Sequence, residues 1–251
     1  MDKKQPFYIG TSGWTYDDWS GTFYPKEVKA PERLSFYAGR FNTVEINATF
    51  YRLPTQPMVS AWNRRLGEGF HLVAKGSRVV THLKKLENCL EPLQTFLDRV
   101  LQLTRLEVIL WQLPPSLHKD RLRLERFLSM LPRGVRHAVE FRHKSWWDEE
   151  TAELLASHEA AFVAVSHPKL PETIYPTTDF LYVRFHGKGP DLYRYDYSHD
   201  ELLEWVRNME PHLQERALYA FFNNDYNANA VRNALVLREI LSQSPSGQEP
   251  K

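Results

Sequence analysis

The sequence predicts an α/β protein built as a single (β/α)8 TIM barrel with a polar C-terminal mouth. Two observations carry this prediction. Eight strand-like runs recur along the 251 residues, and a helix-like stretch follows all but one of them. Several runs also place polar residues at alternate positions near their carboxyl ends, where barrels of this class have their active sites. An open doubly wound sheet is the alternative, but no glycine-rich phosphate-binding sequence follows the first run.

The strand-like runs are rich in β-branched and aromatic residues, from FYIGTSG at 7–13 to RALYAFFNN at 216–224. The clearest helix start is Ser198, with Glu201 completing a capping box. We predict one domain over 1–241 and a disordered tail over 242–251. The predicted strands are 7–13, 43–50, 70–76, 106–114, 137–143, 161–168, 180–187 and 216–224; the predicted helices lie near 31–40, 57–66, 90–104, 120–131, 147–158, 198–210 and 227–242, with a loop over 169–178.

The composition is that of a soluble globular protein, with 42% hydrophobic and 25% charged residues. The formal net charge of +1 gives no sign of bulk nucleic-acid or membrane binding. The single Cys89 cannot form an intramolecular disulfide, which is typical of a reducing compartment. Since no signal peptide or bilayer-spanning run is recognisable, we expect a cytoplasmic protein without a membrane partner.

Alternation in the run TVEINATF, residues 43–50, puts Glu45 and Asn47 on one face and Val44 and Ile46 on the other. In a barrel the outer faces pack against helices and are apolar, so the polar face must look inward near the mouth. We therefore expect Glu45 in one cavity with residues from other strands. The same alternation assigns to the interior Glu45, Asn47, Lys75, Gln112, Glu140, Arg142, Arg184, His186 and Asn223.

Seven segments also resemble the signature blocks of the DUF72 (YecE-like) family, over residues 7 to about 240. The resemblance implies a TIM barrel and a bacterial-type cytoplasmic protein, in a family without an established reaction but compared with nucleases of the endonuclease IV type. One departure is AVSHPKLP, where Ser166 and His167 stand at a position that is acidic in many members. The segments are YIGTSGWTYDDWSGTFYP, TVEINATFYRLP, LVAKGSRVVTHLKKL, WQLPPS, AVEFRHKSWW, LYVRFHGKG and FFNNDYNANAVRNAL.

The two inward glutamates, Glu45 and Glu140, could be the acid and base of a glycosidase. That chemistry requires one carboxyl group with a raised pKa, whereas Arg142, Arg184 and Lys75 at similar depth favour ionised carboxylates. The alternative is that the glutamates pair with these cations and brace the mouth.

Histidines near strand ends raise the question of a metal. A divalent cation needs surplus negative charge or several converging ligands, but the inward residues carry one surplus positive charge and the sequence has no HxxxH or HxH motif. We therefore predict no cofactor and no tightly bound metal. If a metal is present, the candidate ligands are His82, His143, His167 and His186.

The same charge count favours an anion. Arginine and lysine at a barrel mouth suit phosphate or carboxylate groups, and exposed tyrosines suit nucleobases or sugar rings. The first hypothesis is an anionic, phosphate-bearing ligand, with phosphoester hydrolysis as the reaction class: Glu45 or Glu140 activates water and His186 donates the proton. A non-catalytic module for a metabolite or nucleic-acid fragment is the alternative from another class. The expected ligand-binding residues are Asn47, Tyr51, Lys75, Gln112, Arg142, Arg184, Tyr195, Asn223 and Asn224.

Overall fold

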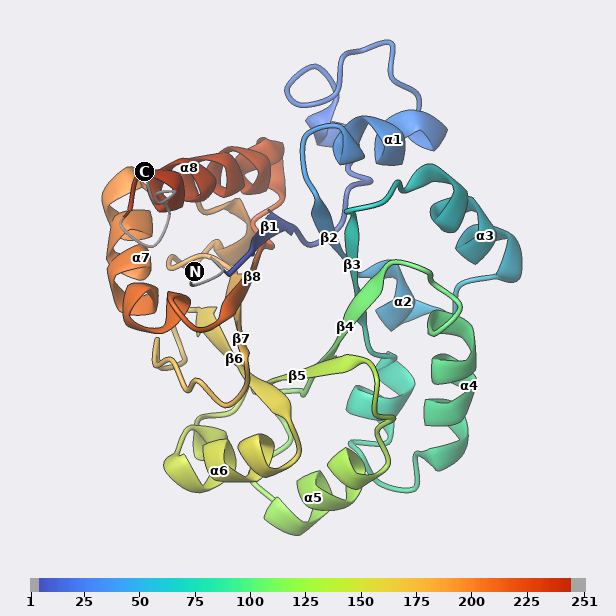
Figure 1. The fold of residues 1–251 in the computed structure, drawn as a ribbon, viewed down its shortest axis with the longest axis vertical. Coiled ribbons are helices and arrows are strands. Elements are labelled where there is room, and N and C mark those ends of the chain that lie inside the picture. The colour runs from blue at the N-terminus through green and yellow to red at the C-terminus, as the bar shows by residue number, and fades with distance from the viewer. Residues whose placement is uncertain (1–4, 245–251) are drawn as a thin grey trace.

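The computed structural model describes residues 5–244, which fold into a nearly closed barrel of eight parallel strands surrounded by helices (Figure 1). The strands are hydrogen-bonded in the order β1-β8-β7-β6-β5-β4-β3-β2. The (β/α)8 prediction is confirmed. The strands are β1 (Phe7–Thr11), β2 (Thr43–Ile46), β3 (His71–Lys75), β4 (Leu106–Gln112), β5 (Arg136–Glu140), β6 (Ala160–Ser166), β7 (Phe180–Phe185) and β8 (Ala217–Phe222).

All eight predicted strands are present, but each observed strand ends before the predicted carboxyl end. The difference is largest at β2. The chain leaves the β conformation at Asn47 (φ −74°, ψ −24°) and turns into the short helix α2 (Ala48–Tyr51). Thr49 stabilises this turn, because its hydroxyl contacts the carbonyl oxygens of Ile46 at 2.8 Å and Lys75 at 2.7 Å. The prediction of a strand over 47–50 is therefore wrong.

The helices lie outside the strands (Figure 1). The capping box of Ser198 and Glu201 is confirmed at the start of α7. A π-helix over Val79–Leu83 follows β3 and was not expected. The α-helices besides α2 are α1 (Arg33–Ala38), α3 (Gln56–Arg65), α4 (Leu90–Val100), α5 (Arg121–Ser129), α6 (Glu149–Ser157), α7 (His199–Leu213) and α8 (Asn229–Gln243).

The predicted loop between β6 and β7 is confirmed, and it takes the place of a helix. Tyr175 packs its ring 4.8 Å from that of Phe162, and the Thr177 hydroxyl contacts the Ala160 carbonyl at 2.8 Å. The predicted tail over 242–251 is helical at its start, because α8 continues to Gln243. Its remaining part from 245 lies outside the described residues.

The alternation expected from the sequence separates two apolar layers. Outward side chains such as Val44, Ile109 and Val183 belong to the larger core beneath the helices. Inward side chains such as Val108 and Val163 fill the barrel with aromatic residues from β7 and β8, including Tyr182. The interior is therefore packed, and a ligand can enter only above this layer.

The barrel closes between β1 and β2 along a narrow seam. Ser12 and Glu45 form an isolated parallel bridge, in place of a continuous ladder. The Tyr37 hydroxyl fills the gap below, because it accepts a hydrogen bond from the Thr11 amide at 3.0 Å and donates to the Thr43 carbonyl at 3.2 Å. A Cβ atom at Gly10 would lie 2.5 Å from that carbonyl, so glycine is required for the two strands to approach.

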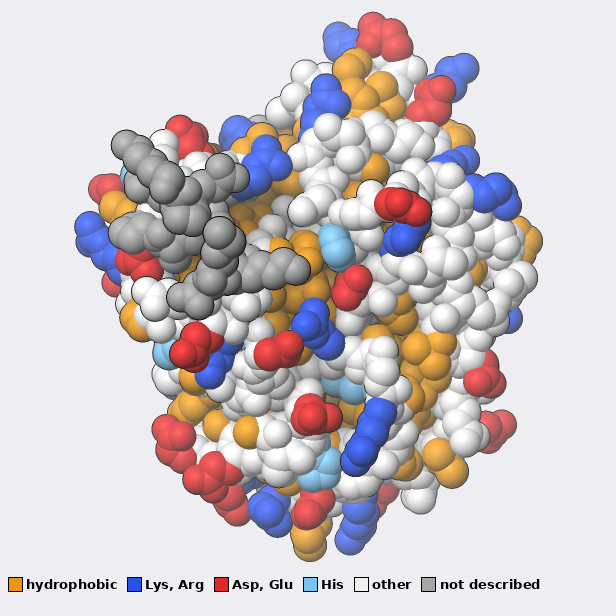
Figure 2. All heavy atoms as spheres, viewed as in Figure 1, with side chains coloured by type: hydrophobic (Ala, Val, Ile, Leu, Met, Phe, Trp, Pro, Cys, Tyr) orange, Lys and Arg blue, Asp and Glu red, His pale blue; other side chains and the backbone are white. Residues whose placement is uncertain are grey.

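The distribution of charge on the surface in Figure 2 is even, as expected from the nearly equal numbers of acidic and basic residues. Acidic and basic side chains are interspersed over the face in Figure 2, without a large area of one sign. Within the described part of the chain, no helix has the length and apolar character needed to cross a bilayer.

Candidate functional site

A buried ion cluster lies at the carboxyl ends of β2, β5 and β7. Arg184 joins the two glutamates, with Nη2 2.6 Å from Glu45 Oε1 and Nη1 in contact with Glu140 Oε2. All three side chains have no exposed surface. Because hydrogen bonds between a guanidinium and a carboxylate are short and directional, the single contact from Arg184 to each glutamate fixes the three strands relative to one another.

Glu45 is fully satisfied by neighbours. Besides Arg184, its Oε1 accepts a hydrogen bond from the Ser12 hydroxyl at 2.7 Å, and its Oε2 accepts one from the Tyr182 hydroxyl at 2.7 Å. Burial raises the pKa of Tyr182 well above its ordinary value, with Glu45 as the next cause, so the phenol remains a donor. Glu45 thus connects the seam of the barrel to the ion cluster.

Glu140 is held by Arg184 and by two residues from the loops above it. Arg142 Nε contacts Glu140 Oε1, and His186 Nε2 lies 3.2 Å from the same oxygen. Arg142 Nη2 lies 2.9 Å from His186 Nε2, and Asn223 Nδ2 lies 3.2 Å from His186 Nδ1. These contacts link the buried cluster to the mouth through Arg142 and Asn223.

The protonation states follow from this packing. Burial alone would raise the pKa of Glu140, but Arg142 and Arg184 more than offset it, so the pKa lies well below its ordinary value. Burial, reinforced by Arg142, places the pKa of His186 well below its ordinary value. At neutral pH the cluster therefore holds an ionised Glu140 and a neutral His186, and neither is a ready proton donor.

Above the cluster lies a cavity of about 730 Å³, open at the mouth of the barrel. Six of the residues expected to bind a ligand line it: Asn47, Tyr51, Lys75, Gln112, Arg142 and Asn223. The expected catalytic residues Glu45, Glu140 and His186 lie beneath it, as does Arg184. Alternation along the strands therefore identifies the inward residues, while depth divides them into a buried floor and a cavity wall.

The cavity wall carries more positive than negative charge. Its described residues include three cations, Lys75, Arg142 and Lys169, and one carboxylate, Asp225. Burial raises the pKa of Asp225 above its ordinary value. Arg142 is shared with Glu140 below, whereas Lys75 and Lys169 form no ion pair with the buried glutamates. Burial lowers the pKa of Lys75 to about 7, so its positive charge is lost as the pH rises through neutrality.

Two expected ligand-binding residues have other partners. The Asn224 side chain is buried, and its Nδ2 donates to the Tyr195 carbonyl at 2.8 Å and to Asn233 Oδ1 at 2.7 Å. The Tyr195 hydroxyl donates to Glu201, which together with burial raises the pKa of Tyr195 to about 12. Both residues anchor the loop after β7, and it is Tyr193 on this loop that faces the cavity.

The four histidines considered for a metal do not converge. His143 stacks on His118 with ring centres 3.9 Å apart, whereas His82 packs against the Phe50 ring. His167 and His186 are neighbours, with ring centres 6.2 Å apart. Across residues 5–244, the histidine, cysteine, aspartate and glutamate side chains form no group of three or more that could hold a metal ion.

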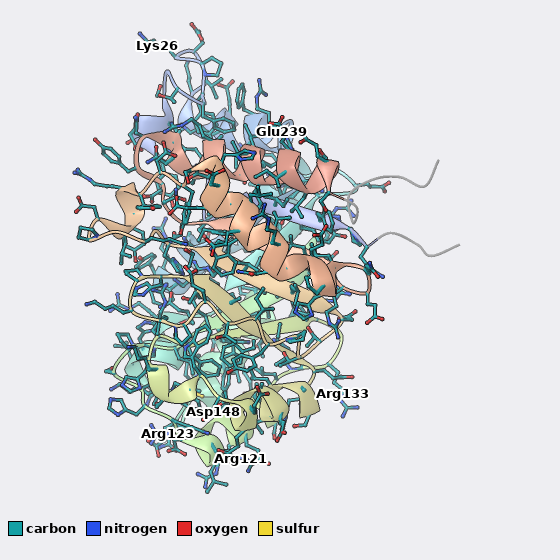
Figure 3. The ribbon with its side chains drawn as sticks, turned by 90° about the vertical axis from the view of Figure 1, so that its left-hand side faces the viewer. Lys26, Arg121, Arg123, Arg133, Asp148 and Glu239 are labelled. Atoms are coloured by element: carbon teal, nitrogen blue, oxygen red, sulfur yellow. The ribbon has the colours of Figure 1, made fainter. Side chains whose placement is uncertain are left out.

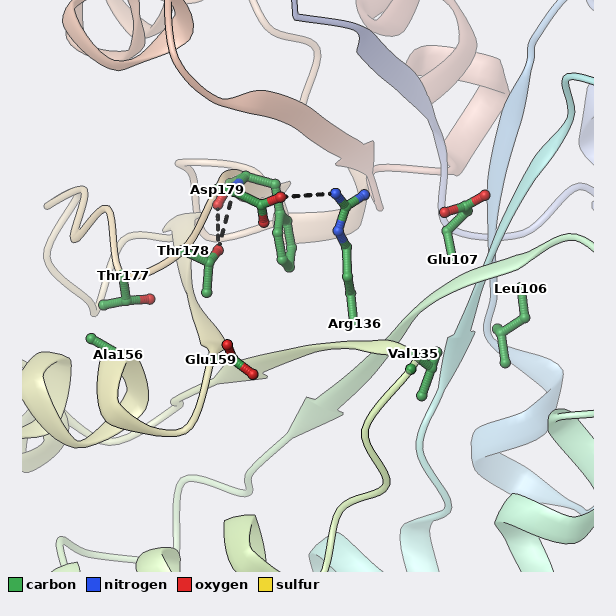
Figure 4. Close-up of a pocket in the computed structure, with 11 residues that line it drawn as sticks. Leu106, Glu107, Val135, Arg136, Ala156, Glu159, Thr177, Thr178 and Asp179 are labelled. Carbon is green, nitrogen blue, oxygen red and sulfur yellow. Dashed lines mark hydrogen bonds and ion pairs between the residues drawn. The ribbon is translucent and has the colours of Figure 1, made fainter.

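A second cavity, of about 610 Å³, lies at the opposite end of the barrel, where β4, β5 and β7 begin (Figure 4). Arg136 is its central cation, and it forms an ion pair with Asp179 at 3.0 Å. Arg136 also donates to the Tyr219 hydroxyl at 3.3 Å. Because Arg136 is already paired with Asp179 and Tyr219, the cavity at the mouth is the better candidate for a ligand-binding site.

Comparison with known proteins places the chain in a family. Residues 8–251 match the family model described as "Protein of unknown function DUF72". The chain belongs to the DUF72 family. It is also 24% identical over 278 residues to the UPF0759 protein YunF of Bacillus subtilis, with 97% of this chain and 98% of the relative covered.

Solved structures of DUF72 proteins share the fold. A DUF72 family protein from Thermotoga maritima is 32% identical, with a TM-score of 0.81 over 95% of this chain and 100% of that chain. Another, from Enterococcus faecalis, is 21% identical, with a TM-score of 0.80 over 98% of both chains. The second likeness concerns the fold alone.

Sequence reasoning missed several residues at the mouth of this DUF72 protein. Ser12 and Tyr182 complete the shell around Glu45, and Asp225 is the carboxylate on the cavity wall. Alternation could have found Tyr182, which precedes Arg184 by two positions within β7, whereas Asp225 lies beyond the end of β8, where alternation no longer applies. Lys169 lies on a loop, where the sequence gives no comparable signal, whereas Tyr193 belongs to the tyrosine-rich loop segment that composition indicates as a ligand contact.

Proposed function

We propose that the cavity at the barrel mouth binds an anionic, phosphate-bearing small molecule. The observation that carries this proposal is the charge of the cavity wall: Lys75, Arg142 and Lys169 against Asp225. The side-chain amides of Asn47, Gln112 and Asn223 supply neutral hydrogen bonds that orient a ligand. Tyr51 is 67% exposed and Tyr193 is 48% exposed, so each offers a ring face to a planar part of the ligand.

Phosphate binding can be tested by thermal melts and calorimetry at constant ionic strength. We expect phosphate to raise the melting temperature of the wild type by mass action. Lys169→Met should weaken phosphate binding by about three- to tenfold, because one exposed charge a few ångströms from an anion contributes on the order of 1 kcal/mol. Lys26→Met is the matched control, since Lys26 lies at one end of the molecule (Figure 3). A wild type indifferent to phosphate would contradict the proposal.

Phosphoester hydrolysis is the second candidate, and Asp225 is the observation that favours it. In the first hypothesis Glu45 or Glu140 activates water, but the oxygens of both carboxylates are already held by buried donors. Asp225 instead lines the cavity, and burial raises its pKa, which makes it a stronger base than an ordinary aspartate. We expect the wild type to hydrolyse p-nitrophenyl phosphate. Asp225→Asn should abolish this hydrolysis and leave phosphate binding intact. The absence of turnover in the wild type leaves binding as the function.

A nucleic-acid fragment as ligand predicts a different salt response. Affinity should then fall steeply with added salt, because each neutralised phosphate releases counterions. A small phosphate-bearing molecule held by two or three cations should show a shallow slope. The slope of log affinity against log salt, measured with a short oligonucleotide and with inorganic phosphate, separates the two ligands.

A further inference from the structure

Lys75 differs from the other cations of the cavity in its surroundings. It is the last residue of β3, it is 8% exposed and it lines the cavity. Its Nζ lies 4.4 Å from the centre of the Phe50 ring. Among the described residues it has no ion-pair partner, because the two nearest glutamates are bound to arginines.

The electrostatic environment of this amino group disfavours its charged form. Burial, with Arg184 as the next cause, lowers the pKa of Lys75 to about 7. An ordinary lysine has a pKa near 10.4. The neutral amine of Lys75, which is the nucleophilic form, is therefore accessible near pH 7. The charged and titratable groups that face it are Glu45 from β2, His82 from the π-helix, Glu140 and Arg142 at the end of β5, and Arg184 from β7.

We propose that Lys75 is a nucleophile that forms an imine with the carbonyl carbon of an aldehyde or ketone held in the cavity by its anionic group. This inference rests on the proposed function, because the bound anionic group orients the ligand toward Lys75. It extends the proposed function by specifying that the ligand also carries an aldehyde or ketone. The cavity of about 730 Å³ has room for a ring-bearing phosphate. Lys169 and Arg142 on the same wall would hold the anionic group while Lys75 meets the carbonyl group.

The reaction balances without an oxidant or reductant. The neutral Nζ attacks the carbonyl carbon and forms a C–N bond, while the electrons of the C=O double bond move to oxygen. The resulting carbinolamine loses this oxygen with two protons from the amine as water, which leaves a C=N bond. Uptake of one proton gives an iminium ion with the charge of the original ammonium.

The test uses the full chain at pH 7 with pyridoxal 5′-phosphate as the probe, since it combines an aldehyde, a ring and a phosphate. Borohydride reduces the imine to a stable amine, and peptide mass spectrometry locates it. We expect Lys75 to be labelled at least about tenfold faster than Lys26, because burial favours the neutral, nucleophilic amine of Lys75 and the cavity holds the probe beside it. Equal rates at the two lysines in the folded wild type would overturn the proposal, and this comparison needs no variant.

Variants and a second probe separate this inference from the proposed function. Lys75→Met should lose one equivalent of fast label, whereas Lys26→Met should retain it; equal fast labelling of both variants overturns the proposal. If pyridoxal without phosphate labels Lys75 at the same rate and phosphate gives no protection, the imine stands and anion binding fails. If phosphate stabilises the protein but Lys75 stays unlabelled, anion binding stands and the imine fails.

Discussion

Arg184 and Glu45 form an ion pair of 2.6 Å in which neither side chain has any exposed surface. The pair lies beneath the cavity and is completed by Glu140 on the other side of the guanidinium. A cluster of this kind is costly to disrupt, because a charge left without its partner in a buried site keeps its full desolvation penalty.

Replacing Arg184 should therefore affect stability more than binding. We expect Arg184→Met to lower the free energy of unfolding by about 3–5 kcal/mol, the usual cost of breaking a buried pair. Arg121→Met is the control, since Arg121 lies at the surface (Figure 3). Its ion pairs with Glu125 and Glu150 are solvent-exposed, so the substitution should cost less than about 1 kcal/mol. Urea denaturation of both variants provides the measurement. A cost for Arg184→Met no larger than the control would mean that the cluster is hydrated in solution.

The hydroxyl of Tyr182 should also contribute measurably. Tyr182→Phe removes a hydrogen bond to the Glu45 carboxylate and leaves Oε2 without that donor. We expect a loss of about 1.5–3 kcal/mol, as for hydrogen bonds to charged groups. Tyr193→Phe, at an exposed ring, should change stability by less than about 0.5 kcal/mol. Equal effects of the two substitutions in urea denaturation would argue that water replaces the Tyr182 hydroxyl.

Stability should fall with decreasing pH between about 6.5 and 4, partly through His167. Burial and the nearby Arg142 lower the pKa of His167 to about 4, so the folded protein keeps this imidazole neutral while the unfolded chain protonates it. Unfolding therefore takes up a proton in this range, and acid favours the unfolded state. His167→Gln should reduce proton uptake by up to about one proton, measured from urea denaturation at pH 5 to 7.

The seam between β1 and β2 should not accept a side chain at Gly10. A Cβ atom there would lie 2.5 Å from the Thr43 carbonyl and 3.0 Å from the Tyr37 hydroxyl. We expect Gly10→Ala to cost about 1–3 kcal/mol, as for overpacking elsewhere in protein cores. Gly39→Ala provides the matched control, because its Cβ would meet nothing closer than 3.4 Å. Thermal unfolding of both variants tests this, and an unaffected Gly10→Ala would show that the strands can separate at the seam.

The faces of the strands could be predicted because alternation follows from backbone geometry alone. Glu45, Arg184 and Gln112 needed no knowledge of their neighbours to be assigned to the interior. Their depth was not predictable, since it depends on how the strands are staggered and on the loops that cover their ends. Glu140 is thus enclosed, while Arg142, two residues later, reaches the cavity.

Residues beyond the strand ends were harder to predict for a related reason. The turn at Asn47 into α2 carries Tyr51 to the rim, and it depends on hydrogen bonds from Thr49 to two separate strands. Tyr195 and Asn224 are residue types common on binding surfaces, yet the Tyr195 hydroxyl donates to Glu201 in α7 and the Asn224 side chain to the loop after β7 and to Asn233 in α8. Only the tertiary structure distinguishes a side chain that anchors a loop from one that the loop presents to the cavity.

The seam has a consequence for the order in which the protein matures during synthesis. Ser12 reaches Glu45 in a barrel whose first strand also pairs with β8, so the floor of the site joins segments more than 170 residues apart. A nascent chain still attached to the ribosome before β8 emerges cannot complete this arrangement, whatever helices and strands it has already formed. Binding of phosphate therefore requires that β8 has docked against β1. A chain truncated before Ala217 should have no affinity for phosphate even where it remains partly folded.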